Sequence, residues 1–406
     1  MLLAQIWRNE KLLKSGVPIV KMGENFKKLN QDSVFMIGMF NSPHFQAWVR
    51  AFQKEFPNKK LLLFPSDRPI QEIFSKKTLT TNHRHTRLWS ISPFHKINFF
   101  LYALLDLTLG LKWRAFFLGR LIEKRLPETL HFHEMQHGAY IFNLLWGSPK
   151  LPVGTRRIIS TWGSDLTLYS WVDSHQSNLK TSLGWATTLT AEKLSEKEDA
   201  SRLGYAGHFR APVYIHVGRP PREQFEYAPP SSRKIILLKG YQTNPGRALN
   251  ALHVLSNLKD LLGDYEICVY SATEPVKVQV DILRNREGLN IKVVRLNHKE
   301  MQELFQTARI SIGISESDGL PAAFIESIHA GAFPIQSGNS AVDLFVHHGK
   351  SGFLVQPWDL ISLTDFVRNA LLNDQLVDQA AEENRKILNE KYNLEQGLIE
   401  LRNLYH

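Results

Sequence analysis

Short runs of apolar residues alternate along the chain with stretches in which apolar residues recur every three or four positions. The first run, 33–39, has the length of a buried strand, and the Asn-Ser-Pro sequence after it is a helix-start signal. Between 44 and 56 the apolar side chains fall on one helical face, and 60–64 forms a second strand-like run. Strand, helix, strand in this order is a βαβ unit, which builds parallel sheets.

The same alternation continues to the end of the chain, with a proline-rich, polar interruption at 218–232. It predicts an N-terminal α/β domain over 1–217, in which 1–31 shows no clear pattern, and a C-terminal domain over 233–393. Further strands are expected at 129–132, 157–160, 211–217, 234–238, 266–270, 291–296, 310–314 and 333–336, and helices at 246–262, 299–307, 321–330 and 394–405.

Residues 93–126 predict two helices that combine aromatic and basic side chains. A basic helix with an aromatic face is typical of elements that lie on a membrane surface. A helix packed on the core, with a solvated outer face, has the same pattern. The cations of this stretch are Lys96, Lys112, Arg114, Arg120, Lys124 and Arg125.

The net charge of +10 is unevenly divided, because residues 1–217 carry +13 and residues 218–406 carry −3. Such asymmetry predicts that one domain faces an anionic partner: nucleic acid, an acidic membrane surface or a phosphorylated substrate. No recognised nucleic-acid-binding module accompanies the charge.

The composition is that of a globular protein, with 43% hydrophobic and 22% charged residues among 406. The single cysteine, Cys268, excludes a disulfide framework and multi-cysteine metal sites. The most apolar stretch, 97–111, is interrupted by Asn98 and Asp106 and is too short for a membrane span. The first residues lack the basic start of a signal peptide, so we expect a cytoplasmic protein.

The most informative segment follows the expected strand at 310–314. A short loop carries Asp318 and Gly319, and a helix begins near Pro321. This order directs backbone N–H groups and the positive end of a helix dipole at the mouth of the sheet, which favours an anion such as phosphate. Glu326 follows Asp318 after seven intervening residues, and carboxylates accept hydrogen bonds from hydroxyls. The pattern therefore predicts a nucleotide sugar; an ordinary βα unit in which Asp318 only caps the helix is the less favoured alternative.

This segment resembles the acid–x7–Glu signature of retaining glycosyltransferase family 4, whose members are two-domain enzymes of the GT-B fold. Downstream, Gly331, Pro334 and Gly352 stand at the offsets found in that family. The resemblance is strong over 309–360 and looser over 129–204. It implies an α/β chain with two Rossmann-like domains whose parallel sheets face a central cleft, and a C-terminal helix at 394–405 that packs back on the N-terminal domain.

By this resemblance, Asp318 would contact hydroxyls of the donor sugar and Glu326 would bind the ribose of the nucleotide. The amides around Gly319 and Leu320, ahead of Pro321, would hold the diphosphate. Most members of the family have Glu where this chain has Asp318, and the shorter side chain has less reach.

The family also places basic side chains against the diphosphate, after the first strand of the C-terminal domain. This chain offers Lys239 at the end of that strand and Arg247 where its helix begins, with a spacing that differs from the usual one. Cations at these positions would stabilise the charge that develops on the leaving group. Surface solvation is the alternative interpretation of each.

The N-terminal half contains Trp162, Gly163, Ser164 and Asp165 after an expected strand. They resemble the His-Gly-Ser-Asp loop of family 4, with Trp162 where many relatives carry His, as in bacterial members that build surface polysaccharides. These four are cleft candidates. By fold analogy, the loop with Asn41, Ser42 and His44 lies on the acceptor side.

His133, Glu134 and His137 formally match the His-Glu-x-x-His motif of zinc proteases, in which one helix carries both imidazoles. The motif begins on a strand-like run, Tyr140 stands where the metzincin glycine is required, and no Glu occurs between Glu134 and Glu192. A histidine-rich strand end that lines the cleft, with His137 on the acceptor side, is the favoured interpretation, and no metal site is predicted.

Together these features predict a retaining glycosyltransferase of hexosyltransferase type that needs no metal or other cofactor. Its partners would be a nucleotide-diphosphate sugar, a glycan or lipid-linked precursor of a surface polysaccharide (lipopolysaccharide, capsule or exopolysaccharide), and the anionic inner face of the cytoplasmic membrane, without nucleic acid. The alternatives are a catalytically degenerate GT-B protein that serves as a scaffold in polysaccharide assembly, suggested by Asp318 and Trp162, and a zinc metalloprotease.

Overall fold

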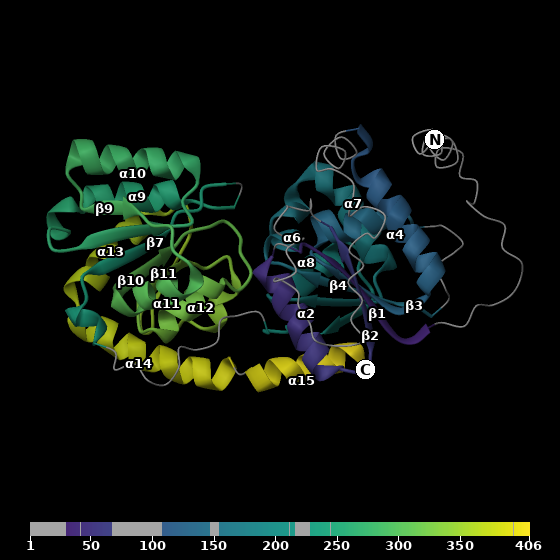
Figure 1. Cartoon of the computed structure of the whole chain (residues 1–406). Coiled ribbons are helices and arrows are strands. Elements are labelled where there is room, and N and C mark those ends of the chain that lie inside the picture. Colours follow the sequence, from purple (N-terminus) through teal and green to yellow (C-terminus); the bar gives the residue numbers. More distant parts are fainter. Residues whose placement is uncertain are drawn as a thin grey trace, which may run out of the picture. The chain divides into compact units, whose positions relative to one another are not determined.

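The computed structural model describes residues 30–40, 42–66, 108–146, 154–210, 212–215, 228–243, 245–392 and 394–406. Within these residues the strands form two six-stranded sheets, one from residues 30–210 and the other from residues 235–355 (Figure 1). This is the α/β architecture expected from the alternation of strand and helix patterns. The predictions for 1–29, for 93–107 and for Asn41 lie outside the described residues.

The first sheet has the order β2-β1-β3-β4-β5-β6, and β1 pairs in parallel with both β2 and β3. Chain order reverses at β1, so the topological switch point of this sheet lies between β1 and β3. Its strands are β1 (Asn30–Gly38), β2 (Lys60–Pro65), β3 (Pro127–His133), β4 (Arg156–Thr161), β5 (Thr188–Ala191) and β6 (His208–Arg210). The helices of this part are α2 (Pro43–Glu55), α4 (Leu111–Arg125), α5 (Tyr140–Asn143), α6 (Ser164–Thr167), α7 (Asp173–Trp185) and α8 (Glu196–Arg202).

The prediction of a strand at 211–217 is wrong for the residues of this range that the structure describes. Residues 212–215 have no regular structure, and the edge strand β6 instead comes earlier and is three residues long. The apolar character of Val213 and Ile215 suggested a strand, but these side chains are buried without a strand partner. Burial alone therefore produced the misleading pattern.

Helix α4 is the described part of the aromatic, basic stretch. It buries Trp113, Ala115, Leu118 and Ile122, while Phe116, Phe117 and Leu121 are only partly covered. Arg114 is buried too, and its guanidinium donates a hydrogen bond to the carbonyl of Ser66. Arg114 is therefore not part of a solvated basic face, which in α4 consists of Lys112, Arg120 and Lys124.

The second sheet has the order β12-β11-β10-β7-β8-β9, and all of its strand pairs are parallel. In chain order this is the 3-2-1-4-5-6 arrangement of dinucleotide-binding domains, and the switch point lies between β7 and β10. The strands are β7 (Ile235–Lys239), β8 (Glu266–Tyr270), β9 (Ile291–Val293), β10 (Ala308–Gly313), β11 (Phe333–Ser337) and β12 (Phe353–Val355). The helices are α9 (Ala248–Asn257), α10 (Glu274–Glu287), α11 (His298–Thr307), α12 (Ala322–His329), α13 (Leu360–Leu372), α14 (Asp374–Lys391) and α15 (Leu394–Tyr405).

Successive side chains of these strands point to opposite faces of the sheet, and both faces are covered by helices. Ile236 and Leu238 pack with α9, α10 and α13, whereas Leu237 and Cys268 pack with residues of α11 and α12 (Figure 1). By the same alternation Lys239 points to the α11 and α12 side. The strand period thus decides which helices can meet the side chain at the end of β7.

Helix α15 has the bounds expected from the sequence. It packs on α2, where the rings of Phe52 and Tyr405 lie 4.8 Å apart and Arg402 forms an ion pair with Glu55. Among the described residues, no helix is long and apolar enough to cross a membrane.

Candidate nucleotide-sugar site

Two pairs of side chains, Lys239 with Asp318 and His298 with Glu326, lie near the switch point of the second sheet. In α/β domains a crevice forms there, at the carboxyl ends of the strands. Lys239 ends β7, and its Nζ lies 2.7 Å from Oδ2 of Asp318 in the loop after β10. Oδ1 of Asp318 accepts a hydrogen bond of 3.0 Å from the amide of Gly319. The N-cap of α12 is Pro321, which makes no side-chain cap, so Asp318 faces Lys239 and does not cap this helix.

Glu326 lies in the middle of α12 with 9% of its surface exposed. Its Oε1 is 2.8 Å from Nε2 of His298, the first residue of α11. Tyr270, at the end of β8, is near both acids: burial, followed by the charges of Asp318 and Glu326, raises the pKa of its phenol. The two carboxylates of the acid–x7–Glu segment therefore flank one small region at the ends of β7, β8 and β10.

The loop that carries Asp318 is fixed to the segment before α9. The amide of Arg247 donates to Ile314, the amide of Glu316 donates to Pro245, and Gly246 and Ser315 form an isolated antiparallel bridge. A Cβ on Gly246 would lie 2.1 Å from the carbonyl oxygen of Tyr241, so this close approach requires glycine. The backbone of one loop thereby sets the position of the other.

Arg247 takes part in the same contact. Its guanidinium forms an ion pair with Glu316 and donates to the carbonyls of Thr243 and Gly246 at 3.1 and 2.7 Å. Arg247 is thus engaged by its own loop and by Glu316, whereas Lys239 is the cation that meets the acid–x7–Glu segment directly. The sequence placed both near the diphosphate without distinguishing these positions.

The downstream residues of the motif shape the domain. Gly331 has φ +88° between α12 and β11, a conformation that favours glycine. A Cβ on Gly352 would lie 2.5 Å from Cγ of Pro334, which explains why these two residues occur together where β11 and β12 approach. Their spacing therefore follows from packing.

A hollow of about 280 Å³ has Tyr270 in its lining. It is formed by 270–272 after β8 and by 293–296 at the end of β9, with Lys277 and Met301 at its sides. It therefore adjoins Tyr270, which is close to both acids, and ends next to the start of α11. Its lining mixes apolar side chains with the cations Lys277 and Arg295, as small-molecule sites do.

The first sheet has its own cluster at its switch point. The rings of His131 and His133 lie 4.0 Å apart on β3, and Nε2 of His131 is 2.7 Å from Oγ of Ser160. Burial, then the charges of His133 and Arg156, hold the pKa of the His131 imidazole well below its usual range. Burial thus favours the neutral form of the His131 imidazole.

The His-Glu-x-x-His residues do not share a helix. His133 ends β3, Glu134 turns the chain with φ 68°, and His137 lies in a π-helical turn, Met135–Ala139. Both oxygens of Glu134 are used by this turn, since Oε1 accepts from the amide of Gly138 at 2.7 Å and Oε2 lies 2.9 Å from Nδ1 of His137. No group of three metal-binding side chains occurs within the described part of the chain. The geometry is that of a helix cap.

The loop of Trp162, Gly163, Ser164 and Asp165 is held by a hydrogen bond within the loop itself. Asp165 is buried, and its Oδ2 accepts from the amide of Trp162 at 2.8 Å, while the rings of Trp162 and His44 lie 5.7 Å apart. Gly163 has φ 53°, which allows the turn into α6, where Ser164 is the first residue. The structure thus brings His44 and Trp162 together, and it gives Asp165 a role in shaping the loop. Ser42 is half-buried directly before α2.

Glu196, which the sequence did not single out, holds this loop from behind. Its carboxyl accepts hydrogen bonds from the hydroxyls of Thr161 and Thr167, and it is fully buried. Burial raises the pKa of Glu196 well above its ordinary value. The hydrogen bond from Thr161 lowers this pKa, and the negative charge of Asp165 raises it further. A charged residue in the first turn of a short helix gave no sign of this, because its burial depends on tertiary packing.

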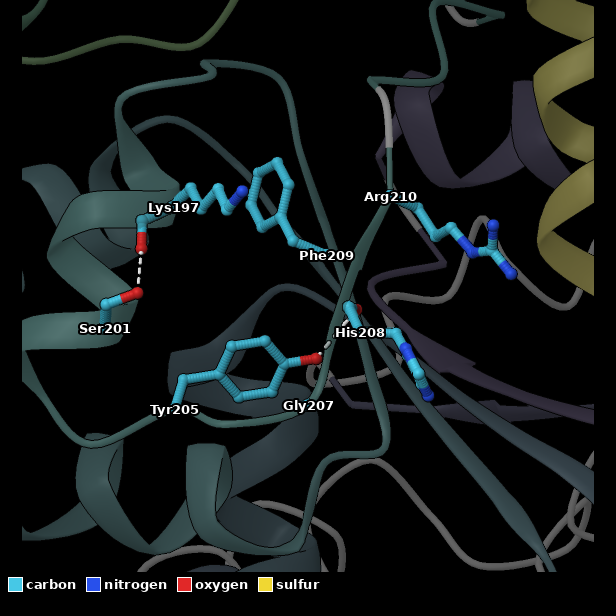
Figure 2. A pocket seen from close by; sticks show the side chains of 7 residues that line it. All are labelled: Lys197, Ser201, Tyr205, Gly207, His208, Phe209 and Arg210. Carbon is cyan, nitrogen blue, oxygen red and sulfur yellow. Dashed lines mark hydrogen bonds between the residues drawn. The ribbon is translucent and has the colours of Figure 1, made fainter.

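A second hollow, of about 300 Å³, lies beside β6 (Figure 2). In Figure 2 the side chain of Lys197 points toward Phe209, whereas that of Arg210 extends away on the other side of the strand. Its cations do not converge on one point, so we assign it no ligand. The lining residues are Lys197, Ser201, Tyr205, Gly207, His208, Phe209 and Arg210.

Comparison with known proteins finds solved structures with a similar fold. No protein-family model matches the chain, and a search of curated proteins finds no match. Sucrose-phosphate synthase from Thermosynechococcus elongatus has a TM-score of 0.67 at 14% identity, over 92% of this chain and 98% of that one. HepE from Anabaena, solved in complex with UDP-glucose, has a TM-score of 0.64 at 10% identity, over 92% and 99%.

TarM from S. aureus, solved in a complex that includes UDP, has a TM-score of 0.58 at 11% identity and is matched over 71% of this chain. The chain spans 58% of the length of TarM. At these identities the likeness shows the fold alone: two α/β domains of the GT-B type, as expected from the sequence.

Proposed function

We propose that the chain is a glycosyltransferase that moves a sugar from a nucleotide-diphosphate sugar to an acceptor. The observation that carries this is the meeting of Lys239 with Asp318 at the switch point of the second sheet, with Glu326 on the following helix. One cation for the diphosphate and two carboxylates that can accept hydrogen bonds from hydroxyls match the chemistry of such a donor. That HepE and TarM were solved with UDP-glucose and with UDP supports the same donor class.

In this proposal the 280 Å³ hollow takes the nucleoside base, Glu326 takes the ribose, and Asp318 takes hydroxyls of the sugar. Lys239 and Arg247 neutralise the charge of the diphosphate. The amides of Gly319 and Leu320, ahead of Pro321, donate hydrogen bonds to it in place of the carboxylates that they contact in the free protein. As in family 4, transfer retains the anomeric configuration and uses no metal. Ser42, His44, His137 and the Trp162 loop, together with Asn41, belong to the acceptor side.

Donor turnover tests this proposal. The wild-type protein is incubated with a panel of UDP-, GDP- and ADP-sugars, and release of nucleoside diphosphate is measured with and without glycan acceptors. We expect release from the sugars of one nucleotide. Saturable binding without any release would instead favour the second candidate, a degenerate GT-B scaffold, which the shorter Asp318 in place of Glu suggests.

We further propose that the N-terminal domain, residues 1–217, binds an anionic membrane or a lipid-linked precursor of a surface polysaccharide on the cytoplasmic side. The support is its charge of +13 and the exposed cations Lys112, Arg120 and Lys124 of α4. Electrostatic adsorption needs anionic lipid and weakens with salt, because ions screen exposed charges over about 10 Å at 0.1 M.

Vesicle flotation tests this membrane proposal. Binding is expected with vesicles that contain phosphatidylglycerol, to be lost at high salt and to fall when Lys112, Arg120 and Lys124 are all replaced by Gln. The matched control replaces the exposed cations Lys259, Arg286 and Lys350 of the other domain by Gln and should bind as wild type. Flotation that ignores salt, or that both variants lose equally, would reject the proposal.

A further inference from the structure

His298 is the first residue of α11, and its start is fixed by a reciprocal cap. The side chain of Asn297 accepts from the amides of Lys299 and Glu300 at 3.0 and 3.1 Å, and Glu300 accepts from the amide of Asn297 at 2.7 Å. This capping box leaves little freedom for the backbone of His298. The imidazole is therefore held at a defined place beside α12, although 67% of its side chain is exposed.

The imidazole reaches Glu326, a carboxylate in an apolar setting. Its neighbours on α12, Phe324, Ile325 and Ile328, are buried in one hydrophobic cluster. A buried carboxylate without hydrogen bonds is costly, and the bond of 2.8 Å from Nε2 of His298 to Oε1 satisfies one of its oxygens. Because a carboxylate only accepts, this nitrogen carries the proton.

We propose that His298 is a positioning residue for nucleotide recognition: by holding Oε1 of Glu326 it fixes the carboxylate so that it accepts hydrogen bonds from the vicinal hydroxyls of the ribose. This rests on the proposed function and deepens it, since it names the group that orients the ribose acceptor. His298 itself acts through Glu326. Its loss therefore affects the part of the binding energy that depends on ribose hydroxyls.

The experiment compares a ribonucleotide with an analogue that lacks those hydroxyls. Calorimetry measures the affinity of UDP and of 2′,3′-dideoxy-UDP, with the GDP and ADP pairs in parallel, for wild type and for His298→Ala. We expect His298→Ala to weaken the ribonucleotide about 10- to 100-fold, the size of one hydrogen bond to a charged group, and to leave the dideoxy analogue unchanged. His298→Gln, which keeps an N–H donor, should restore part of the loss.

Lys299→Ala is the matched control, because Lys299 is the next residue of α11 and its side chain is 86% exposed. It should change neither affinity. In a Glu326→Ala background, His298→Ala should have no further effect, since the two residues act as one unit. Equal weakening of both nucleotides by His298→Ala and His298→Gln would show a structural role and overturn the inference.

The failure of the proposed function has a different signature. If wild type binds none of the nucleotides, the donor site itself is wrong and the inference falls with it. If wild type prefers the ribonucleotide and His298→Ala keeps the full preference, the proposed function stands and only the role of His298 is rejected.

Discussion

Replacing Glu326 with Ala will reduce sugar transfer by about 10²- to 10⁴-fold, because two hydrogen bonds to a charged acceptor are worth roughly 1.5–3 kcal/mol each. The effect should fall on donor binding as well as on turnover, since the ribose is held in both the ground state and the transition state. The measurement is the rate of nucleoside-diphosphate release together with the affinity for the donor.

Two variants separate chemistry from folding in this prediction. Glu326→Gln keeps the size of the side chain and one acceptor oxygen, so it should fall between wild type and Glu326→Ala. Glu303→Ala removes an exposed carboxylate from the neighbouring α11 and should behave as wild type. Transfer near the wild-type rate in Glu326→Ala would mean that the acid on α12 has no part in the site.

Replacing Lys239 with Ala will lower turnover by about 10²- to 10³-fold, the usual consequence of removing one group that stabilises developing charge. Lys239 is the stronger test of the two cations, because Arg247 also supports Glu316 and two carbonyls and its loss would disturb the loop. In free protein, Lys239→Ala leaves Asp318 without its ion pair, so the thermal midpoint should change only slightly for this partly exposed pair.

Lys239→Arg keeps the charge and should retain more of the turnover than Lys239→Ala. Lys234→Ala, at an exposed position just before the same strand, is the control for a lost cation and should turn over normally. If Lys239→Ala and Lys234→Ala turn over equally well, the pair with Asp318 is only a structural ion pair.

The sequence predicted the elements whose pattern is local. The strand at 266–270 and the helix at 394–405 have the expected bounds. A compact apolar run and a one-sided apolar helix face are set by nearby residues, so they can be recognised without knowledge of the tertiary structure. It missed β5, whose Thr188-Leu-Thr-Ala sequence contains too few large apolar residues to stand out. It also missed α10, a helix with only three buried residues among many charged ones.

The candidate site divides in the same way. Lys239, Asp318 and Glu326 could be found from the sequence, since each follows a strand or lies on the helix after it, and parallel strands bring such ends together. The contact of His298 with Glu326 could not, because it joins two helices that are separated by a strand. Glu196 was missed because only tertiary packing tells a buried carboxyl from a surface one.

The central claim is that the second sheet carries a nucleotide-sugar site at its switch point, and saturable binding is its most direct measure. Wild type and Glu326→Ala are titrated with a panel of UDP-, GDP- and ADP-sugars while the thermal midpoint is followed, since a ligand that binds the folded state raises it. We expect sugars of one nucleotide to raise the midpoint of wild type in a concentration-dependent way, and Glu326→Ala to lose most of this response. No response to any nucleotide sugar, or an equal response in both proteins, would contradict the central claim.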